Sequence, residues 1–225
     1  YTLLAEGARG SLTKELIRRF SLDAESGPQK YGIGLKELWE VPKEKHRPGL
    51  VQHTMGWPLH DRTGGGSFLY HFGENLVSVG FVVHLDYANP YINLFKEFQR
   101  AKLHPRIALH LEGGRRISYG ARALTEGGWQ AIPRLAFPGG ALIGCGAGFM
   151  NVPRIKGSHN AMLSGMMAAE AAFAAIGAGR SHDVLDAYEG AVKDSSMATE
   201  LKRVRNVKPL WSRLGTYAGI TAGGI

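Results

Sequence analysis

The chain has 225 residues, of which 44% are hydrophobic and 20% charged, the composition of an ordinary globular protein. Its length allows one large domain or two small ones. A single cysteine, Cys145, excludes an internal disulfide framework and a cysteine-rich metal or iron–sulfur site within these residues. The net charge of +8 suits an anionic membrane surface, an acidic protein partner or a phosphate-bearing cofactor. Because no nucleic-acid-binding motif accompanies that charge, nucleic acid ranks last among the partners.

Both ends of the sequence suggest an internal piece of a longer protein. Tyr1 opens a strand-like segment, and residues 222–225 carry no stop signal of their own. No uninterrupted apolar run approaches the roughly 20 residues that a membrane-spanning helix needs. The sequence also carries no secretory signal.

The first quarter of the chain predicts a strand, a glycine-containing turn and a helix. The strand covers residues 2–5, the turn residues 6–10, and the helix residues 12–20 with Ser11 as a plausible N-cap. Further strands are expected over residues 31–41 and 50–57.

The clearest element is a hairpin around residues 73–75. Its first strand, residues 67–72, places Phe68, Tyr70 and Phe72 on one face. The second strand, residues 76–85, carries an apolar residue at every odd position from Val77 to Leu85. Alternation of this kind indicates a strand that buries one face against core, ligand or lipid.

The second half predicts alternating short strands and long helices. Strands are expected over residues 115–124, 135–137 and 141–144, and helices over residues 91–102, 157–176 and 182–204. Ser158 is a possible cap of the second of these helices. Mixed strands and helices give the fold class α/β, or α+β.

A glycine-rich crossing joins a buried strand to the helix predicted at residues 157–176. Residues 142–151 read LIGCGAGFMN. Free backbone N–H groups and a helix N-terminus favour an anion or an electron-rich carbonyl, such as the N1–C2=O edge of a flavin. The alternative is an ordinary junction packed through small residues. No G-x-G-x-x-G fingerprint occurs in the sequence, so any FAD pyrophosphate loop lies outside it.

Ten short motifs, in the same order along nearly the whole chain, resemble the electron-transfer flavoprotein–ubiquinone oxidoreductase family. They are YGIGLKELW at residues 31–39, GWPL at 56–59, GGSFLYH at 65–71, LDYANPY at 85–91, EFQR at 97–100, LEGG at 111–114, YGARAL at 119–124, FMNVP at 149–153, IKG at 155–157 and VRN at 204–206.

The resemblance implies an enzyme, an electron-transferring-flavoprotein dehydrogenase of the respiratory chain. Members take electrons from reduced electron-transfer flavoprotein and pass them to ubiquinone through FAD and a [4Fe–4S] cluster. They sit on the membrane as monotopic proteins. The resemblance therefore implies the cytoplasmic face of a bacterial inner membrane or the matrix face of the mitochondrial inner membrane. The ligands of the [4Fe–4S] cluster are expected outside these residues, so the isolated piece is expected to be inactive.

The same resemblance predicts the domain organisation. We expect part of a Rossmann-like FAD-binding domain at residues 1–30 and its continuation at residues 126–204. An inserted antiparallel-sheet and helix domain at residues 31–125 binds ubiquinone. Residues 205–225 form a basic and aromatic segment near the membrane.

The ubiquinone site is expected at Gly65 and Gly66, which match the glycine pair of the family. A residue without Cβ lets a quinone carbonyl reach the backbone N–H. The apolar hairpin behind the pair suits an isoprenoid tail. The alternative is a glycine turn at the entry of the hairpin.

Five residues match the FAD-binding segments of the family. Glu6 and Gly7 are expected near the adenosine half of FAD, and Gly148, Met150 and Asn151 along the isoalloxazine ring. We predict no catalytic acid–base residue and no metal ligand, because electron transfer depends on cofactor placement.

One position departs from related flavoproteins. They usually carry Gly-Asp where this chain has Gly144-Cys145, so the aspartate that meets the ribityl–pyrophosphate region is missing here. Cys145 is interpreted as a packed small residue and not as a redox centre.

The end of the chain combines basic and aromatic residues without any acidic one. Such a pattern suits contact with lipid headgroups. The alternative is a basic helix end that docks on a further domain. The residues concerned are Lys202, Arg203, Arg205, Lys208 and Arg213, followed by Leu210, Trp211, Leu214, Tyr217 and Ile220.

Two other functions stay open from sequence alone. One is an FAD-dependent reductase or hydroxylase of lipid-like substrates, and the other is a non-catalytic fragment that binds membrane or quinone.

Overall fold

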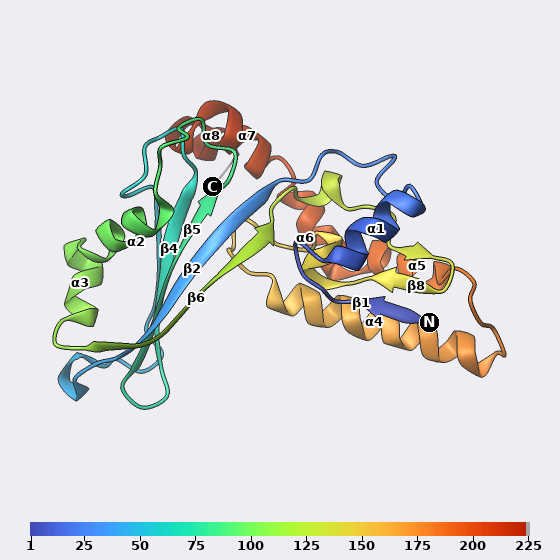
Figure 1. The fold of residues 1–225 in the computed structure, drawn as a ribbon, viewed down its shortest axis with the longest axis horizontal. Helices are drawn as coiled ribbons and strands as arrows, with labels where there is room; N and C mark the ends of the chain where they lie inside the picture. Colours follow the sequence, from blue (N-terminus) through green and yellow to red (C-terminus); the bar gives the residue numbers. More distant parts are fainter. Residues whose placement is uncertain (224–225) are drawn as a thin grey trace. The chain divides into compact units, whose positions relative to one another are not determined.

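The computed structural model describes residues 1–223 and divides the chain into two compact units. Unit 1 comprises Tyr1–Tyr31 and Leu124–Pro209, and unit 2 comprises Gly32–Ala123 and Leu210–Ile225. Gly224 and Ile225, the end of the predicted membrane-proximal segment, lie outside the described residues. Both units mix helices and strands, which confirms the predicted fold class (Figure 1).

Unit 1 contains a three-stranded sheet in the order β1-β8-β7. β1 (Thr2–Leu4) pairs in parallel with β8 (Gly140–Leu142), and β7 (Ala136–Phe137) pairs with β8 in antiparallel fashion. The register sets Leu4 opposite Leu142. Because the two strands run in parallel, the loops that follow β1 and β8 leave from the same edge of the sheet, where α/β folds bind ligands.

The helices of unit 1 differ from the prediction at two places. α1 (Ser11–Arg19) and α4 (Ser158–Gly177) lie where helices are expected, but Gly10 and Gly157, not Ser11 and Ser158, are their N-caps. The single helix predicted over residues 182–204 is wrong. The structure has α5 (Asp186–Asp194) and α6 (Ser196–Arg203) instead.

Ser195 causes the break between α5 and α6. Its backbone is extended, with φ −74° and ψ 156°, and its hydroxyl accepts a hydrogen bond from the N–H of Ala198 at 3.1 Å. A serine side chain that satisfies a free N–H group favours a new helix start over continuation of the old helix.

Unit 2 is built on a five-stranded sheet in the order β3-β4-β5-β2-β6. The pairs β3–β4, β4–β5 and β2–β5 are antiparallel. The strands are β2 (Tyr31–Glu40), β3 (Val51–Met55), β4 (Gly65–Phe72), β5 (Leu76–His84) and β6 (Arg115–Thr125).

Four helices complete unit 2. α2 (Leu94–Lys102) and α3 (Pro105–Leu111) follow β5, and α7 (Val207–Leu214) and α8 (Thr216–Gly223) close the described chain (Figure 1). α2 starts three residues later than predicted, because Asn93 caps it by accepting a hydrogen bond from the N–H of Lys96. α3, α7 and α8 are not predicted from sequence. Within residues 1–223, none of the helices combines the length and apolarity needed to cross a bilayer.

The hairpin of β4 and β5 provides the core of unit 2. Every odd residue of β5 from Val77 to Val83 is fully buried, as the alternation predicts, and packs with Phe98 of α2 and Ile107 of α3. Leu85 lies beyond β5 and is exposed, so its predicted place on this face is wrong. The rings of β4 follow one another on the opposite face, with Phe68 stacked on Tyr70 and Tyr70 against Phe72.

Glu37 of β2 is the most deeply buried charged side chain of this sheet, at 2% exposure. Its carboxylate accepts hydrogen bonds from Nζ of Lys102 at 2.6 Å, Nε1 of Trp39 at 2.8 Å and Nη1 of Arg116 at 3.3 Å. Burial raises the pKa of Glu37, but the bonds from Lys102 and Trp39 outweigh it and hold the pKa below its ordinary value. The carboxylate therefore ties β2 to α2 and β6.

A second buried polar group joins β4 to α3. A hydrogen bond of 3.2 Å connects Nε2 of His71 with Nδ1 of His110. Nδ1 of His71 accepts from the N–H of Arg47 at 3.0 Å. Burial and the neighbouring His110, His46 and Arg47 lower the pKa of His71 to about 4, so the ring is neutral at ordinary pH.

Candidate functional site

The loops after β1 and β8 meet at one edge of the sheet of unit 1. A Cβ placed on Gly146, in the short helix η3 (Gly144–Ala147), would lie 3.3 Å from the carbonyl oxygen of Gly7. Two glycine-containing loops that are far apart in sequence thus run side by side. The structure thereby brings together the region of Glu6 and Gly7 and the region of Gly148 that sequence alone predicts as cofactor-binding.

Glu6 caps the first turn of α1. Its Oε2 accepts hydrogen bonds from the N–H of Thr13 at 2.6 Å and from its hydroxyl at 2.7 Å, and Oε1 accepts from Leu12 at 3.4 Å. The bonds from Thr13 lower the pKa of Glu6, so the group is ionised at neutral pH. Glu6 is exposed, and from the residues that the structure describes Oε1 accepts only this one long bond, so it has capacity for a ligand hydroxyl.

Gly7 and Gly148 both require glycine for their backbone conformation. Their φ angles are +81° and +91°, in the left-handed region that side chains disfavour. No heavy atom of the described residues lies within 4 Å of a Cβ placed on Gly7, so the space above it is open. A Cβ on Gly148 would lie 3.1 Å from Nε2 of Gln29, a neighbour that no sequence pattern indicates.

Asn151 is fully buried and carries a free donor. Its backbone pairs with Lys156, and its Oδ1 accepts from the N–H of Arg154 at 3.3 Å. Among the described residues its Nδ2 has no hydrogen-bond partner. An unsatisfied buried amide costs free energy unless a ligand or water accepts from it. Met150 beside it is buried, and its sulfur lies 3.0 Å from a Cβ placed on Gly157.

Cys145 lies half-buried in the glycine-rich crossing. The hydroxyl of Thr125 donates to the carbonyl oxygen of Cys145 at 2.9 Å and lies 3.2 Å from its Sγ. The thiol is thus a packed side chain held by Thr125.

Gly65 and Gly66 open β4 in the middle of the sheet of unit 2. Gly66 stands opposite Met55 of β3 and Val82 of β5, and Gly65 opposite Val83. Both are buried. A Cβ on Gly65 would overlap the carbonyl oxygen of Val82 and lie 2.6 Å from Cδ1 of Leu59. Close packing of the sheet therefore requires glycine here, independently of any role in binding a quinone.

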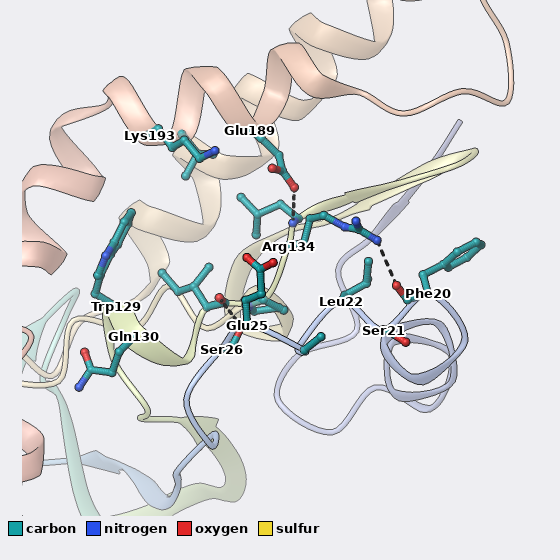
Figure 2. A pocket seen from close by; sticks show the side chains of 15 residues that line it. Phe20, Ser21, Leu22, Glu25, Ser26, Trp129, Gln130, Arg134, Glu189 and Lys193 are labelled. Atoms are coloured by element: carbon teal, nitrogen blue, oxygen red, sulfur yellow. Dashed lines mark hydrogen bonds between the residues drawn. The ribbon is translucent and has the colours of Figure 1, made fainter.

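A cavity that sequence reasoning does not predict lies elsewhere in unit 1. It has a volume of about 680 Å³ and is lined by the segments around Phe20–Ser26, Trp129–Leu135 and Glu189–Lys193 (Figure 2). Several of its polar groups are bonded within the protein, because Glu189 accepts from the N–H groups of Leu135 and Ala136, and Arg134 donates to the carbonyl oxygen of Phe20. None of the predicted cofactor residues, all of which the structure describes, lines it.

The fold is that of flavin-dependent enzymes. A geranylgeranyl bacteriochlorophyll reductase-like protein of Thermoplasma acidophilum has a TM-score of 0.58 at 18% identity, covering 86% of this chain and 51% of that one. The flavin-dependent brominase Bmp2 has a TM-score of 0.57 at 16% identity, covering 96% and 52%. At such identities the likeness establishes the fold, a Rossmann-like flavoenzyme architecture.

The sequence relatives narrow this class. Residues 31–124 match the family model described as ETF-QO, ubiquinone-binding. The chain is 55% identical to the mitochondrial electron transfer flavoprotein-ubiquinone oxidoreductase of Bos taurus over all of its residues, and 51% identical to that of Pseudomonas aeruginosa over 97% of them. The chain therefore belongs to this family, and the predicted resemblance is confirmed along its whole length. The chain spans 38% of the bovine relative and 40% of the bacterial one.

Proposed function

We propose that this chain is the quinone-side segment of an electron-transfer flavoprotein–ubiquinone oxidoreductase. The observation that carries the proposal is the agreement between two boundaries. The family model for ubiquinone binding covers residues 31–124, and the first segment of the structural unit covers Gly32–Ala123, to which Leu210–Ile225 is added. The matched region thus makes up most of one compact unit with its own core, as a binding domain requires.

FAD is the proposed cofactor of unit 1. When bound, it would accept electrons and pass them on one or two at a time. Glu6 would accept a hydrogen bond from the adenosine half, and Gly7 leaves room for close approach of that part. The free Nδ2 of Asn151 would donate to a carbonyl of the isoalloxazine ring, whose face Met150 would contact. The residues present fit FAD for two reasons, the unsatisfied amide of Asn151 and the left-handed backbone of Gly7 and Gly148.

Ubiquinone is the proposed electron acceptor, bound at the end of β4 beside Gly65 and Gly66. Leu59 packs against the position where Gly65 lacks a side chain and offers an apolar contact. At the end of β5, the rings of His84 and Trp211 meet edge to face with centroids 4.6 Å apart. A neutral quinone head suits a buried apolar surface with few polar anchors.

The proposal also includes a separate electron donor and a second redox centre outside these residues. Reduced electron-transfer flavoprotein is the proposed donor, since the relatives are named for it. The proposed [4Fe–4S] cluster would be held outside these residues. We propose a location at the bacterial inner membrane on its cytoplasmic face or at the mitochondrial inner membrane on its matrix face.

Membrane contact is proposed for α7 and α8. Tyr217 is 79% exposed and Leu214 is also exposed, while the chain here carries basic but no acidic residues. The structure corrects one member of the basic set, because Lys208 is only 4% exposed and cannot face headgroups. Aromatic and apolar side chains interleaved with cations suit the headgroup level of a bilayer.

The proposal is tested with the full-length gene product carrying Gly65→Ala. Quinone reduction and flavin reduction by the donor are followed separately, together with flavin content. The expected result is a raised KM for a soluble ubiquinone analogue with unchanged flavin content and flavin reduction. Gly120→Ala is the matched control, since no atom of the described residues lies within 4 Å of its added Cβ. Unchanged quinone kinetics in a folded Gly65→Ala protein would count against the site.

A further inference from the structure

Unit 2 contains a cavity of about 350 Å³ that is not lined by Gly65 or Gly66 and borders the proposed quinone site at Leu59. It lies between the loop that precedes β4, the loop that follows β5, and the first turns of α2. Its walls include Leu59 and Thr63 from the first loop, Asn89 and Ile92 from the second, and Lys96 from the helix. Its volume is at the low end of the range for small-molecule sites.

The lining of this cavity is cationic. Arg62, Lys96 and Arg100 all border it, against the single carboxylate of Glu97. Two of the cations are held in place by protein contacts. Nη1 of Arg62 donates to the carbonyl oxygen of Arg213 at 3.0 Å, and Nη1 of Arg100 donates to Glu97 at 2.8 Å. With Lys96 free to move on an exposed stem, the site carries a net positive charge suited to an anion.

One exposed aromatic side chain lines the cavity, and a second contacts one of its cations. Tyr91 lines it and is 92% exposed, while Trp57 and Phe95, the neighbours of Pro58 and Lys96 in sequence, are each 53% exposed. The guanidinium of Arg100 lies over the Trp57 ring, 5.6 Å from its centroid. Aromatic rings beside cations are typical of protein surfaces at the level of lipid headgroups.

The cavity is joined to the proposed membrane segment by backbone contacts. The N–H of Thr216 donates to the carbonyl oxygen of Asp61 at 2.9 Å, and the N–H of Tyr217 donates to Oδ1 of Asp61 at 3.0 Å. Arg62 is the next residue and lines the cavity. The start of α8 is therefore fixed to the same loop that supplies one of the three cations.

We propose that this cavity binds the phosphate headgroup of an anionic phospholipid and sets the depth at which unit 2 sits on the membrane. The inference rests on the proposed membrane contact of α7 and α8 and names the lipid class that this contact recognises. A neutral quinone head would offer no counter-charge to Arg62 and Lys96, whereas a phosphate diester accepts hydrogen bonds from them. Arg100 is already paired with Glu97.

The test compares two double variants of the full-length gene product. Arg62→Gln with Lys96→Gln removes two cations from the cavity. Lys43→Gln with Arg122→Gln removes two exposed cations of the same unit that do not line it. Co-sedimentation is measured with vesicles of phosphatidylcholine alone and of phosphatidylcholine with phosphatidylglycerol, and thermal melting confirms that both variants fold.

The expected result is a loss of affinity for the phosphatidylglycerol vesicles of about tenfold or more in the cavity variant, with phosphatidylcholine binding unchanged. The control variant should lose clearly less. Equal losses in both variants would show general surface charge and overturn the proposal. Stabilisation of the protein by inorganic phosphate in solution, lost in the cavity variant and without any preference for anionic vesicles, would identify a free-phosphate site and also overturn it.

A protein that binds neither kind of vesicle would refute membrane contact itself along with the headgroup site. If the protein binds both kinds of vesicle equally well, membrane contact stands and only the headgroup site fails. The two failures are therefore distinguishable.

Discussion

The Cβ that Gly66 lacks would overlap the carbonyl oxygen of Thr54 on the neighbouring strand. Close approach of β3 to β4 thus requires glycine at this point, independently of any ligand. The same holds for Gly65, whose Cβ would overlap the carbonyl oxygen of Val82. The glycine pair combines a structural role with the proposed quinone role. The effect of a substitution on stability therefore has to be measured beside its effect on quinone kinetics.

Gly66→Ala should therefore lower the free energy of unfolding of the protein by about 1–3 kcal/mol, the usual range for overpacking. Denaturant titration with circular dichroism measures the change. Gly120→Ala on β6 is the control, because its Cβ meets no atom of the described residues within 4 Å. This change should leave stability equal or slightly higher, since alanine lowers the conformational entropy of the unfolded chain. Equal stability of the two variants would mean that β3 and β4 are not this close.

Removal of the Glu37 carboxylate should destabilise unit 2 strongly. Glu37→Gln leaves Lys102, whose side chain is only 11% exposed, without a counter-charge. The expected cost is about 3 kcal/mol or more. Glu40→Gln on the same strand is the control, since its pair with Arg115 is exposed and should change stability by less than about 1 kcal/mol. Similar effects of the two changes in urea titrations would contradict the burial of Glu37.

Acid should destabilise the protein through His71. The pKa of its ring is about 4 in the folded chain, against an ordinary value of 6.5 that the unfolded chain retains, so the unfolded chain binds the proton first. The stability that the protein gains by keeping this ring neutral is complete above pH 6.5. It is lost as the pH falls from there toward about 4. Over that range the loss amounts to about 3 kcal/mol.

Melting temperatures measured from about pH 7 to about pH 5 check this dependence. His71→Gln should flatten the acid limb of the profile, while His182→Gln, at an exposed histidine of unit 1, should leave it unchanged. An unaltered acid limb in the His71 variant would show that another group controls it.

Substitution of Asn151 should affect FAD binding without affecting the stability of the flavin-free protein. In the flavin-free protein, Asn151→Leu removes an unsatisfied buried amide, so stability should change little, the lost bond to Arg154 being long. If Nδ2 donates to the flavin, the same change should weaken FAD binding by about fivefold to tenfold. Flavin fluorescence titration gives the affinity. Unchanged FAD affinity would remove Asn151 from the proposed site.

The sequence predicts the elements whose signal is local. Alternation from Val77 to Val83 indicates the buried face of β5, and the run of small and apolar residues after Gly157 indicates α4. α3 is not predicted because its seven residues, starting at Pro105, are too few to show a helical repeat of apolar positions. The break at Ser195 is missed because a serine inside a helical pattern signals a cap only once its side chain is seen to bind Ala198.

The same difference between local signals and tertiary packing separates the glycines of the candidate site from the buried polar groups of unit 2. The glycines at positions 7 and 148 are recognisable from their motifs, and the structure gives both the left-handed backbone that glycine permits. In contrast, Lys102 and His110, which bond Glu37 and His71, lie 65 and 39 positions away from them and are brought close by tertiary packing alone. Nothing in the local sequence distinguishes Glu37 from an exposed glutamate.

Photoaffinity labelling tests the central proposal, that this segment binds the quinone, most directly. The full-length gene product is irradiated with a photoreactive ubiquinone analogue, and labelled peptides are mapped by mass spectrometry with and without excess ubiquinone. We predict label in unit 2 around Leu59 and Gly65–Gly66, suppressed by ubiquinone. Label confined to unit 1 or to residues outside this chain, or label that ubiquinone does not suppress, would contradict the proposal.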